Sequence, residues 1–230
     1  MRIAVIVAMD EEIGLLKKSI DCVRVDTVAG IQIYTGRYQA HQLFVAQSGI
    51  GKVQAGMVAT ILCNNYFPEV IVNTGSAGGI GADLQIGDVV ISTAVAYHDV
   101  DVTSSGYEYG QLPQQPRFFE ADGELVKKID AAAQIVGQTT HQGLIVSGDQ
   151  FLNSSRAVAR ILQQFPQALA SDMEGAAMGQ VATQFKIPFV VIRAISDVGD
   201  ENSEASFAEF VRDAGERSVQ TLIDFLDHNE

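Results

Sequence analysis

Four apolar runs along the chain each end at a short polar or glycine-rich segment. The runs are residues 3–8, 70–72, 168–170 and 189–195, and they are rich in valine, isoleucine and alanine. Runs that are almost continuously apolar, rather than alternating with polar residues, are typical of strands covered on both faces. We therefore expect these segments to be buried strands of one sheet.

Helical patterns lie between and after these runs. Apolar residues recur at helical spacing at positions 13, 16 and 20 and again at 125, 126, 129 and 133. Further helices are expected over 53–67, 155–165 and 175–185, and a C-terminal helix is expected after the capping-box pair Ser206 and Glu209. Two more strands are expected at 88–92 and 143–147. This alternation predicts an α/β fold with a mixed or parallel sheet.

The segment from Tyr97 to Phe119 is long, polar and rich in aromatic residues. A loop of that length is usually functional or covers a partner. It contains His98, Asp99 and Asp101, which carry potential metal-ligand atoms, but we favour a loop anchored by hydrogen bonds. The four histidines of the chain are far apart in sequence, so no metal site is predicted.

Length and cysteine content favour one domain in a reducing compartment. The 230 residues contain no linker, so we treat residues 1–230 as a single domain. Cys22 and Cys63 lack metal-ligand spacing and are expected to be free buried thiols. The first apolar run is short and leads into acidic residues, which argues against a signal peptide, and no run approaches the ~20 residues of a membrane span. These patterns favour a cytoplasmic protein.

The formal net charge of −13 narrows the choice of partners. Such a charge repels nucleic-acid backbones and anionic lipid surfaces at long range. We therefore expect neither a nucleic-acid nor a membrane partner. A small neutral or zwitterionic substrate carries no such penalty.

Two glycine-rich segments fail the tests for common nucleotide and hydrolase motifs. Gly49 and Gly51 are followed by Gln54 where a dinucleotide fingerprint needs a third glycine, and Lys52 lacks the glycine spacing of a phosphate loop. Ser76 lacks the first glycine of a nucleophile elbow. These glycines are equally compatible with tight turns and with a backbone that lies close to a ligand.

Three carboxylates stand where the predicted strands end. Glu12 follows the first run, Glu174 the third and Asp197 the fourth. Taken singly, Glu12 could decorate a first helical turn, Glu174 could cap a helix, and Asp197 could cap a strand or pair with Arg193. Ligands of α/β sheets bind beyond the carboxyl ends of strands, so the joint placement predicts an active site.

Six segments taken together resemble the bacterial 5′-methylthioadenosine/S-adenosylhomocysteine nucleosidases. They are 49–52 (GIGK), 73–79 (NTGSAGG), 97–103 (YHDVDVT), 106–111 (GYEYGQ), 173–177 (MEGAA) and 193–197 (RAISD). The resemblance spans nearly the whole chain, whereas MEGAA alone would indicate only the wider nucleoside phosphorylase superfamily. It implies a three-layer α/β/α sandwich around a mixed, mostly parallel sheet, a homodimer, no cofactor, and hydrolysis of a nucleoside to adenine and a 5-thio-substituted ribose.

The resemblance also implies roles for individual residues. Asp197 would be the acid at adenine N7, oriented by Ser196. Glu12 would deprotonate the attacking water, and Glu174 would bind the ribose hydroxyls. The other substrate-binding positions implied are Met9, Ile50, Ser76, Ala77, Gly78, Phe151 (stacking on adenine), Leu152 (main chain at the adenine edge), Met173 (beneath the sugar), Arg193 and Phe207. Val102, Tyr107 and Pro113 would reach into the site of the neighbouring subunit.

The chemistry of glycoside cleavage makes demands that these residue types can meet. Positive charge develops on the sugar while electrons flow to the base, so an acid is needed at the base and carboxylates near the ribose. Asp197 must therefore keep a proton near neutrality, and burial at a strand end would raise its pKa.

Two positions depart from the family pattern. Ser104 and Ser105 precede Gly106 where many relatives carry phenylalanine at the second position, and Asp172 stands where glutamate is usual. The first change predicts looser discrimination among 5′-substituents.

Three alternatives remain open from the sequence. A purine nucleoside phosphorylase would need clustered basic residues for phosphate, and the loops offer mainly Lys52 and Arg193 beside the acidic Glu11 and Glu12. Hydrolysis of aminodeoxyfutalosine by the same site would be decided by a substrate panel. A nucleoside-binding sensor without turnover would not need the three carboxylates.

Overall fold

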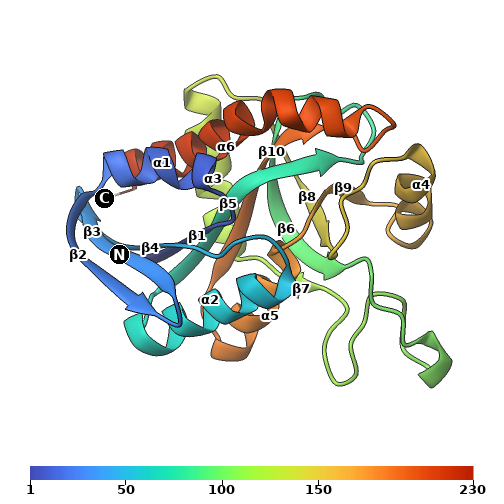
Figure 1. Cartoon of the computed structure of the whole chain (residues 1–230), viewed down its shortest axis with the longest axis horizontal. Helices are drawn as coiled ribbons and strands as arrows, with labels where there is room; N and C mark the ends of the chain where they lie inside the picture. The colour runs from blue at the N-terminus through green and yellow to red at the C-terminus, as the bar shows by residue number, and fades with distance from the viewer. Residues whose placement is uncertain (230) are drawn as a thin grey trace.

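The computed structural model describes residues 1–229, and of residues 11, 22 and 23 only the main chain. A mixed ten-stranded sheet lies between two layers of helices (Figure 1). On one face pack α1 (Asp10–Ser19), α3 (Gly123–Ile135) and α6 (Ser203–His228), and on the other α2 (Lys52–Tyr66) and α5 (Gly175–Phe185). Helix α4 (Ser155–Gln164) lies beside one end of the sheet.

The sheet has a central group of parallel strands, and antiparallel strands extend it. Strands β1, β4, β5 and β10 pair in parallel, and a β2–β3–β4 antiparallel meander forms one edge. The bounds are β1 (Arg2–Val7), β2 (Asp21–Val28), β3 (Ile31–Tyr38), β4 (His41–Gln47), β5 (Val70–Gly79), β6 (Val89–Tyr97), β7 (Phe119–Glu120), β8 (Thr140–Ser147), β9 (Ala168–Asp172) and β10 (Phe189–Asp197). The α/β/α class is as predicted.

Strand β1 shows why the apolar runs are continuous. Its residues Ile3, Val5 and Val7 join the core under α1, α3 and α6. The alternate residues Ala4 and Ile6 join the core under α2 and α5. Because both faces of the strand are buried, a polar side chain on it would need a hydrogen-bond partner inside the protein.

The sheet closes on itself at one end. Strand β10 pairs with both β5 and β6, while β9 pairs with both β5 and β8, so that β5, β10, β6, β8 and β9 form a ring. Because β9 runs antiparallel to β5, its last residue, Asp172, meets the middle of β10 at Arg193 rather than its end. The ring brings polar residues of separate strands together.

Several predicted boundaries are wrong, and the β2–β3–β4 meander was not predicted. The strand expected at 88–92 runs on to Tyr97, and the strand expected at 143–147 begins at Thr140. The run at 70–72 continues as β5 to Gly79, because the glycine-rich segment pairs with β10 and β9. The C-terminal helix begins at Ser203 after Asn202, so Ser206 is an interior residue and caps nothing. Cys63 is a free, buried cysteine as predicted. The side chain of Cys22 lies outside the described residues.

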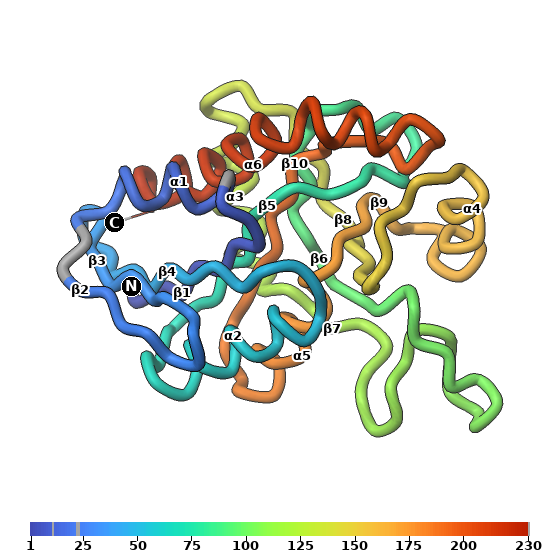
Figure 2. The backbone as a smooth tube through the Cα atoms, in the orientation of Figure 1, coloured from blue at the N-terminus to red at the C-terminus, as the bar shows by residue number. Residues whose placement is uncertain are grey.

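The long segment after β6 projects from the body of the chain (Figure 2). It includes the short helix η1 (Thr103–Ser105). The main chain of His98 anchors its first part, since its N–H donates to Ser147 O at 2.9 Å and its carbonyl accepts from the Tyr109 hydroxyl at 2.9 Å. Among the side chains that the structure describes, we find no His/Cys/Asp/Glu cluster suited to a metal ion.

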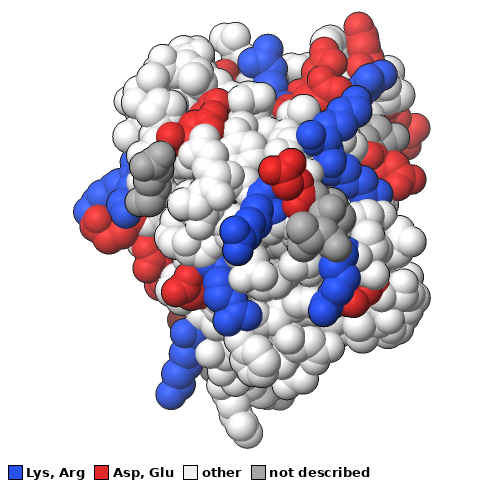
Figure 3. Space-filling view, turned by 90° about the vertical axis from the view of Figure 1, so that its left-hand side faces the viewer, with Lys and Arg blue, Asp and Glu red and all other residues white. Residues whose placement is uncertain are grey.

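On the face that carries the β2–β3 edge, basic and acidic side chains are intermixed (Figure 3). In the part of the chain that the structure describes, no helix is long and apolar enough to cross a bilayer.

Candidate active site

A cavity of about 330 Å³ opens where the loops after β1, β4, β8 and β9 meet β5 and β10. Every residue predicted for the site within one chain lines this cavity: Met9, Glu12, Ile50, Ser76, Ala77, Gly78, Phe151, Leu152, Met173, Glu174, Arg193, Ser196, Asp197 and Phe207. The structure therefore brings together, around one cavity, the three carboxylates found at strand ends and the residues that the family resemblance implied.

Four lining residues were not predicted, namely Ala8, Gln150, Ser171 and Asp172. Asp172 is the important omission, because it binds Arg193. Its position directly before Met173 and Glu174, at the end of a predicted strand, was the available indication. Val102, Tyr107 and Pro113 do not line the cavity of their own chain and lie on the projecting segment.

Glu12 is fixed by main-chain donors at the start of α1. Its side chain is buried, and Oε2 accepts from the N–H groups of Ala8 at 2.8 Å and Met9 at 3.0 Å. Its Oε1 accepts from the N–H of Ser76 on β5 at 3.1 Å. Burial raises the pKa of Glu12, and the charge of Arg193 together with these N–H donors opposes the rise. The carboxylate is thus held in one orientation from both sides.

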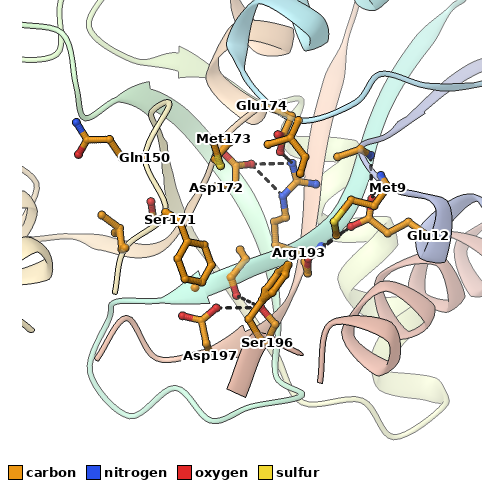
Figure 4. A pocket seen from close by; sticks show the side chains of 18 residues that line it. Met9, Glu12, Gln150, Ser171, Asp172, Met173, Glu174, Arg193, Ser196 and Asp197 are labelled. Carbon is orange, nitrogen blue, oxygen red and sulfur yellow. Dashed lines mark hydrogen bonds and ion pairs between the residues drawn. The ribbon is translucent and has the colours of Figure 1, made fainter. Parts of the chain in front are cut away.

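Arg193 is the buried centre of the polar network (Figure 4). Its Nε and Nη2 lie 2.9 and 2.7 Å from Asp172 Oδ2, and Nη2 donates to Asn73 Oδ1 at 2.7 Å. Glu174 Oε2 lies 3.6 Å from the same nitrogen. The predicted alternative of an Arg193–Asp197 pair is wrong, because Asp172 holds the guanidinium.

Replacing Asp172 with asparagine is expected to lower the free energy of unfolding by about 3 kcal/mol, since breaking a buried pair leaves a charge uncompensated. Urea unfolding measures this loss. The matched control is Glu124→Gln, which breaks the exposed pair between Glu124 and Lys127 and should change stability by less than about 1 kcal/mol. Equal stability of the two variants would contradict a structural role for the buried pair.

Glu174 occupies the N-cap position of α5 but does not cap it. Its side chain makes no bond to the first turn. Instead Oε1 accepts from the N–H of Gly51, at the start of α2, at 2.9 Å. Burial, and then the charge of Asp172, raise the pKa of Glu174 to about 7, and Arg193 opposes the rise.

This raised pKa predicts a pH-dependent stability. The folded state holds the proton of Glu174 more tightly than the unfolded state does, because the pKa is about 7 in the fold and near 4.5 in the unfolded chain. The protonated carboxyl therefore favours the fold at low pH, and this contribution is lost as the pH rises from about 4.5 through about 7. Glutamine at position 174 does not titrate. We compare the melting temperature of Glu174→Gln with that of the wild type at each pH. The difference, variant minus wild type, is expected to be about 5 °C larger at pH 8 than at pH 5.

Thermal unfolding at the two pH values tests this expectation. Glu216→Gln, at an exposed position on α6, is the control and should show the same difference from wild type at both. A gain for Glu174→Gln that is larger at pH 5 would contradict the inferred direction.

Asp197 ends β10 in a different environment. It is buried, with Oδ2 accepting from Ser196 Oγ at 3.0 Å and Oδ1 accepting from the N–H of Gly199 at 3.0 Å. Burial raises the pKa of this carboxyl, against the effect of both donors. In Figure 4, Asp197 and Ser196 lie well apart from Glu12 and Met9. The cavity therefore has a carboxyl group toward each end.

Two aromatic side chains also line the cavity. The rings of Phe151 and Phe207 meet edge to face, with centroids 5.4 Å apart. Phe151 is 42% exposed, so part of its ring is accessible to a flat ligand. The cavity therefore combines buried polar groups with an aromatic surface.

Comparison with known proteins identifies the same family that the sequence motifs resemble. The family model of the phosphorylase superfamily matches residues 2–227. A 5′-methylthioadenosine/S-adenosylhomocysteine nucleosidase from Neisseria meningitidis, solved with methylthio-immucillin-A, is 42% identical, with 98% of each chain covered and a TM-score of 0.96.

Two further solved structures resemble the chain. An S-adenosylhomocysteine nucleosidase from Streptococcus pyogenes is 38% identical, with 100% of this chain and 98% of that chain covered and a TM-score of 0.97. A futalosine hydrolase from Helicobacter pylori is 29% identical, with 99% and 98% covered and a TM-score of 0.94. The chain belongs to the phosphorylase superfamily and, within it, to the family of 5′-methylthioadenosine/S-adenosylhomocysteine nucleosidases, which are N-glycosyl hydrolases.

Proposed function

We propose that this enzyme hydrolyses the N-glycosidic bond of 5′-methylthioadenosine, S-adenosylhomocysteine and 5′-deoxyadenosine. The products are adenine and the correspondingly 5-substituted ribose. The observation that carries the proposal is the pair of buried carboxyl groups, Glu12 and Asp197, toward separate ends of one cavity. A cytoplasmic role in methionine salvage and in removing by-products of methyl transfer follows from these substrates.

In this mechanism Asp197 is the acid. Its raised pKa lets it keep a proton that it donates to adenine N7 as electrons leave the sugar. Ser196 Oγ and the Gly199 N–H fix the carboxyl in place. Phe151 stacks on the base and the main chain of Leu152 binds its edge.

Glu12 is the base in the same mechanism. It takes a proton from water as the water oxygen bonds to C1′ and the bond from C1′ to N9 breaks. Ser76 assists in holding that water. Glu174 binds the ribose hydroxyls and Met173 packs beneath the sugar. Both carboxylates also stabilise the positive charge that develops on the ribose. Arg193 acts through Glu174, whose Oε2 lies 3.6 Å from its Nη2.

Water rather than phosphate fits the charges around the cavity. Among the described residues that line it, Arg193 is the one basic side chain, against Glu12, Asp172, Glu174 and Asp197. The guanidinium is already held by Asp172 and Asn73. Lys52, the other basic candidate, pairs with Asp99. The side chain of Glu11 lies outside the described residues.

A substrate panel tests the proposal. Adenine release is measured from the three proposed substrates and from aminodeoxyfutalosine, in buffers with and without phosphate. We expect release from the proposed substrates without phosphate. Turnover of aminodeoxyfutalosine alone would assign the chain to the other hydrolase, strict phosphate dependence would assign a phosphorylase, and binding without turnover would indicate a sensor.

We also propose that the enzyme works as a homodimer. A groove beside the projecting segment is lined by α2 and α5, where Val53 is 81% and Phe185 41% exposed. Val102, Tyr107 and Pro113 stand outside their own cavity and are free to complete the site of a second copy. Analytical ultracentrifugation is expected to show a dimer, and a fully active monomer would contradict this arrangement.

In this dimer we propose that Ser105 of one subunit limits the space for the 5′-substituent of the nucleoside in the site of its partner. Ser105→Phe is expected to raise the ratio of kcat/KM for methylthioadenosine to that for S-adenosylhomocysteine by about threefold to tenfold, a range typical of size discrimination in apolar pockets. The control is Ser104→Ala. An unchanged or lower ratio would show that position 105 does not limit the pocket.

A further inference from the structure

The middle of α6 lies directly against the side chain of Glu12. Gly215 is buried where α6 packs on α1. A Cβ at this position would lie 2.9 Å from Glu12 Cγ, 3.7 Å from its Cα and 3.8 Å from its Cβ. Contacts of carbon atoms below 3.0 Å do not persist, so one of the two side chains would have to move.

A second glycine limits Glu12 on the other side. A Cβ on Gly75 of β5 would lie 2.7 Å from Glu12 Oε1 and 3.2 Å from Arg193 Nη1. Gly75 and Gly215 therefore form a slot, and the N–H groups of Ala8, Met9 and Ser76 fix the carboxylate within it.

No backbone requirement accounts for glycine at 215. The residue is inside a continuous helix from Ser203 to His228, and its φ is not positive. Glycine in a helix interior is less favourable than alanine. Packing against Glu12 is the feature of the structure that excludes the better helix former.

We propose that Gly215 is a positioning residue, which holds the base Glu12 in its working orientation by leaving space for the Glu12 side chain. This inference rests on the proposed function for its kinetic consequence, and on geometry alone for its effect on stability. The two are therefore tested separately.

The kinetic test is Gly215→Ala assayed on 5′-methylthioadenosine. We expect kcat to fall at least tenfold, with KM and the affinity for adenine within twofold of wild type. Displaced Glu12 loses N–H donors that lower its pKa, so the ascending limb of the kcat/KM profile should move to higher pH. Arg193 and Glu174 are the charged groups that interact electrostatically with Glu12, and neither is substituted in this comparison.

Two glycine variants serve as controls. Gly14 of α1 has no atom within 4 Å of a built Cβ, so Gly14→Ala should leave kcat and the pH profile unchanged. A Cβ on Gly179 of α5 would lie 2.6 Å from Val95 Cγ2, on the opposite face of the sheet from α1. Gly179→Ala should lower the melting temperature without the shift in the pH profile. A Gly215→Ala enzyme that matches wild type in kcat would overturn the proposal.

A double-mutant cycle tests the contact without any assay of turnover. Gly215→Ala is expected to lower the melting temperature in the wild-type background, and to leave it unchanged or raise it in Glu12→Ala, where the crowded Cγ is absent. Equal effects in both backgrounds would refute the contact. If the cycle shows coupling while wild type releases no adenine, the proposed function fails and the packing inference stands.

Discussion

Replacing Asp197 with asparagine is expected to lower kcat for adenine release by about 10²- to 10⁴-fold, the range attributed to a general acid. Asparagine fits the site without disturbance, because its Oδ1 can keep the Gly199 N–H and its amide can donate to Ser196 Oγ, which now acts as acceptor. The amide can donate a hydrogen bond to N7 but cannot transfer a proton. Folding and adenine affinity should therefore be retained.

Steady-state kinetics and adenine titration measure the effect of Asp197→Asn. Ser196→Ala should give a smaller loss, since it removes one orienting donor and leaves the acid. Asp213→Asn, at an exposed position on α6, is the control and should be fully active. Unchanged adenine release by Asp197→Asn would show that Asp197 is not the acid.

The second large effect is expected for Glu12→Gln, again about 10²- to 10⁴-fold in kcat. Here the structure predicts a cost in stability as well. Both oxygens of Glu12 accept main-chain N–H groups, from Ala8 and Met9 on one side and Ser76 on the other. Glutamine has one acceptor oxygen, so its NH₂ group must face an N–H donor.

The kinetics of Glu12→Gln should be read beside its unfolding curve. Adenine affinity is expected to stay near that of wild type, because the base binds at the Asp197 end of the cavity. Glu216→Gln provides the exposed control on α6. An enzyme with Glu12→Gln that retains more than a tenth of kcat would remove Glu12 as the base.

Local pattern was sufficient for β1, β9 and β10 and for several helices, but it did not predict the strands β2, β3 and β4. The helix predicted at 175–185 has those bounds in the structure, and the run at 189–195 lies within β10. These segments are long or strongly apolar, so that burial and local preference favour the same element. The pattern placed Glu12, Glu174 and Asp197 at the polar ends of such segments, whereas the other predicted lining residues came from the family resemblance.

Long-range pairing explains what local pattern did not predict. The glycine-rich stretch 73–79 has the composition of a loop, yet it is a strand because β10 and β9 pair with it. The pairing of Asp172 with Arg193 arises from the closure of the sheet, which no spacing along the chain reveals. The packing of Gly215 on Glu12 likewise joins residues that are far apart in sequence.

Turnover of 5′-methylthioadenosine in phosphate-free buffer, with the sugar product identified by mass, tests the central claim most directly. We expect free adenine and 5-methylthioribose, because water forms the new bond to C1 of the sugar. The same product should be nearly absent with Glu12→Gln. No turnover until phosphate is added, with a sugar 1-phosphate as the product, would contradict hydrolysis and the role of Glu12.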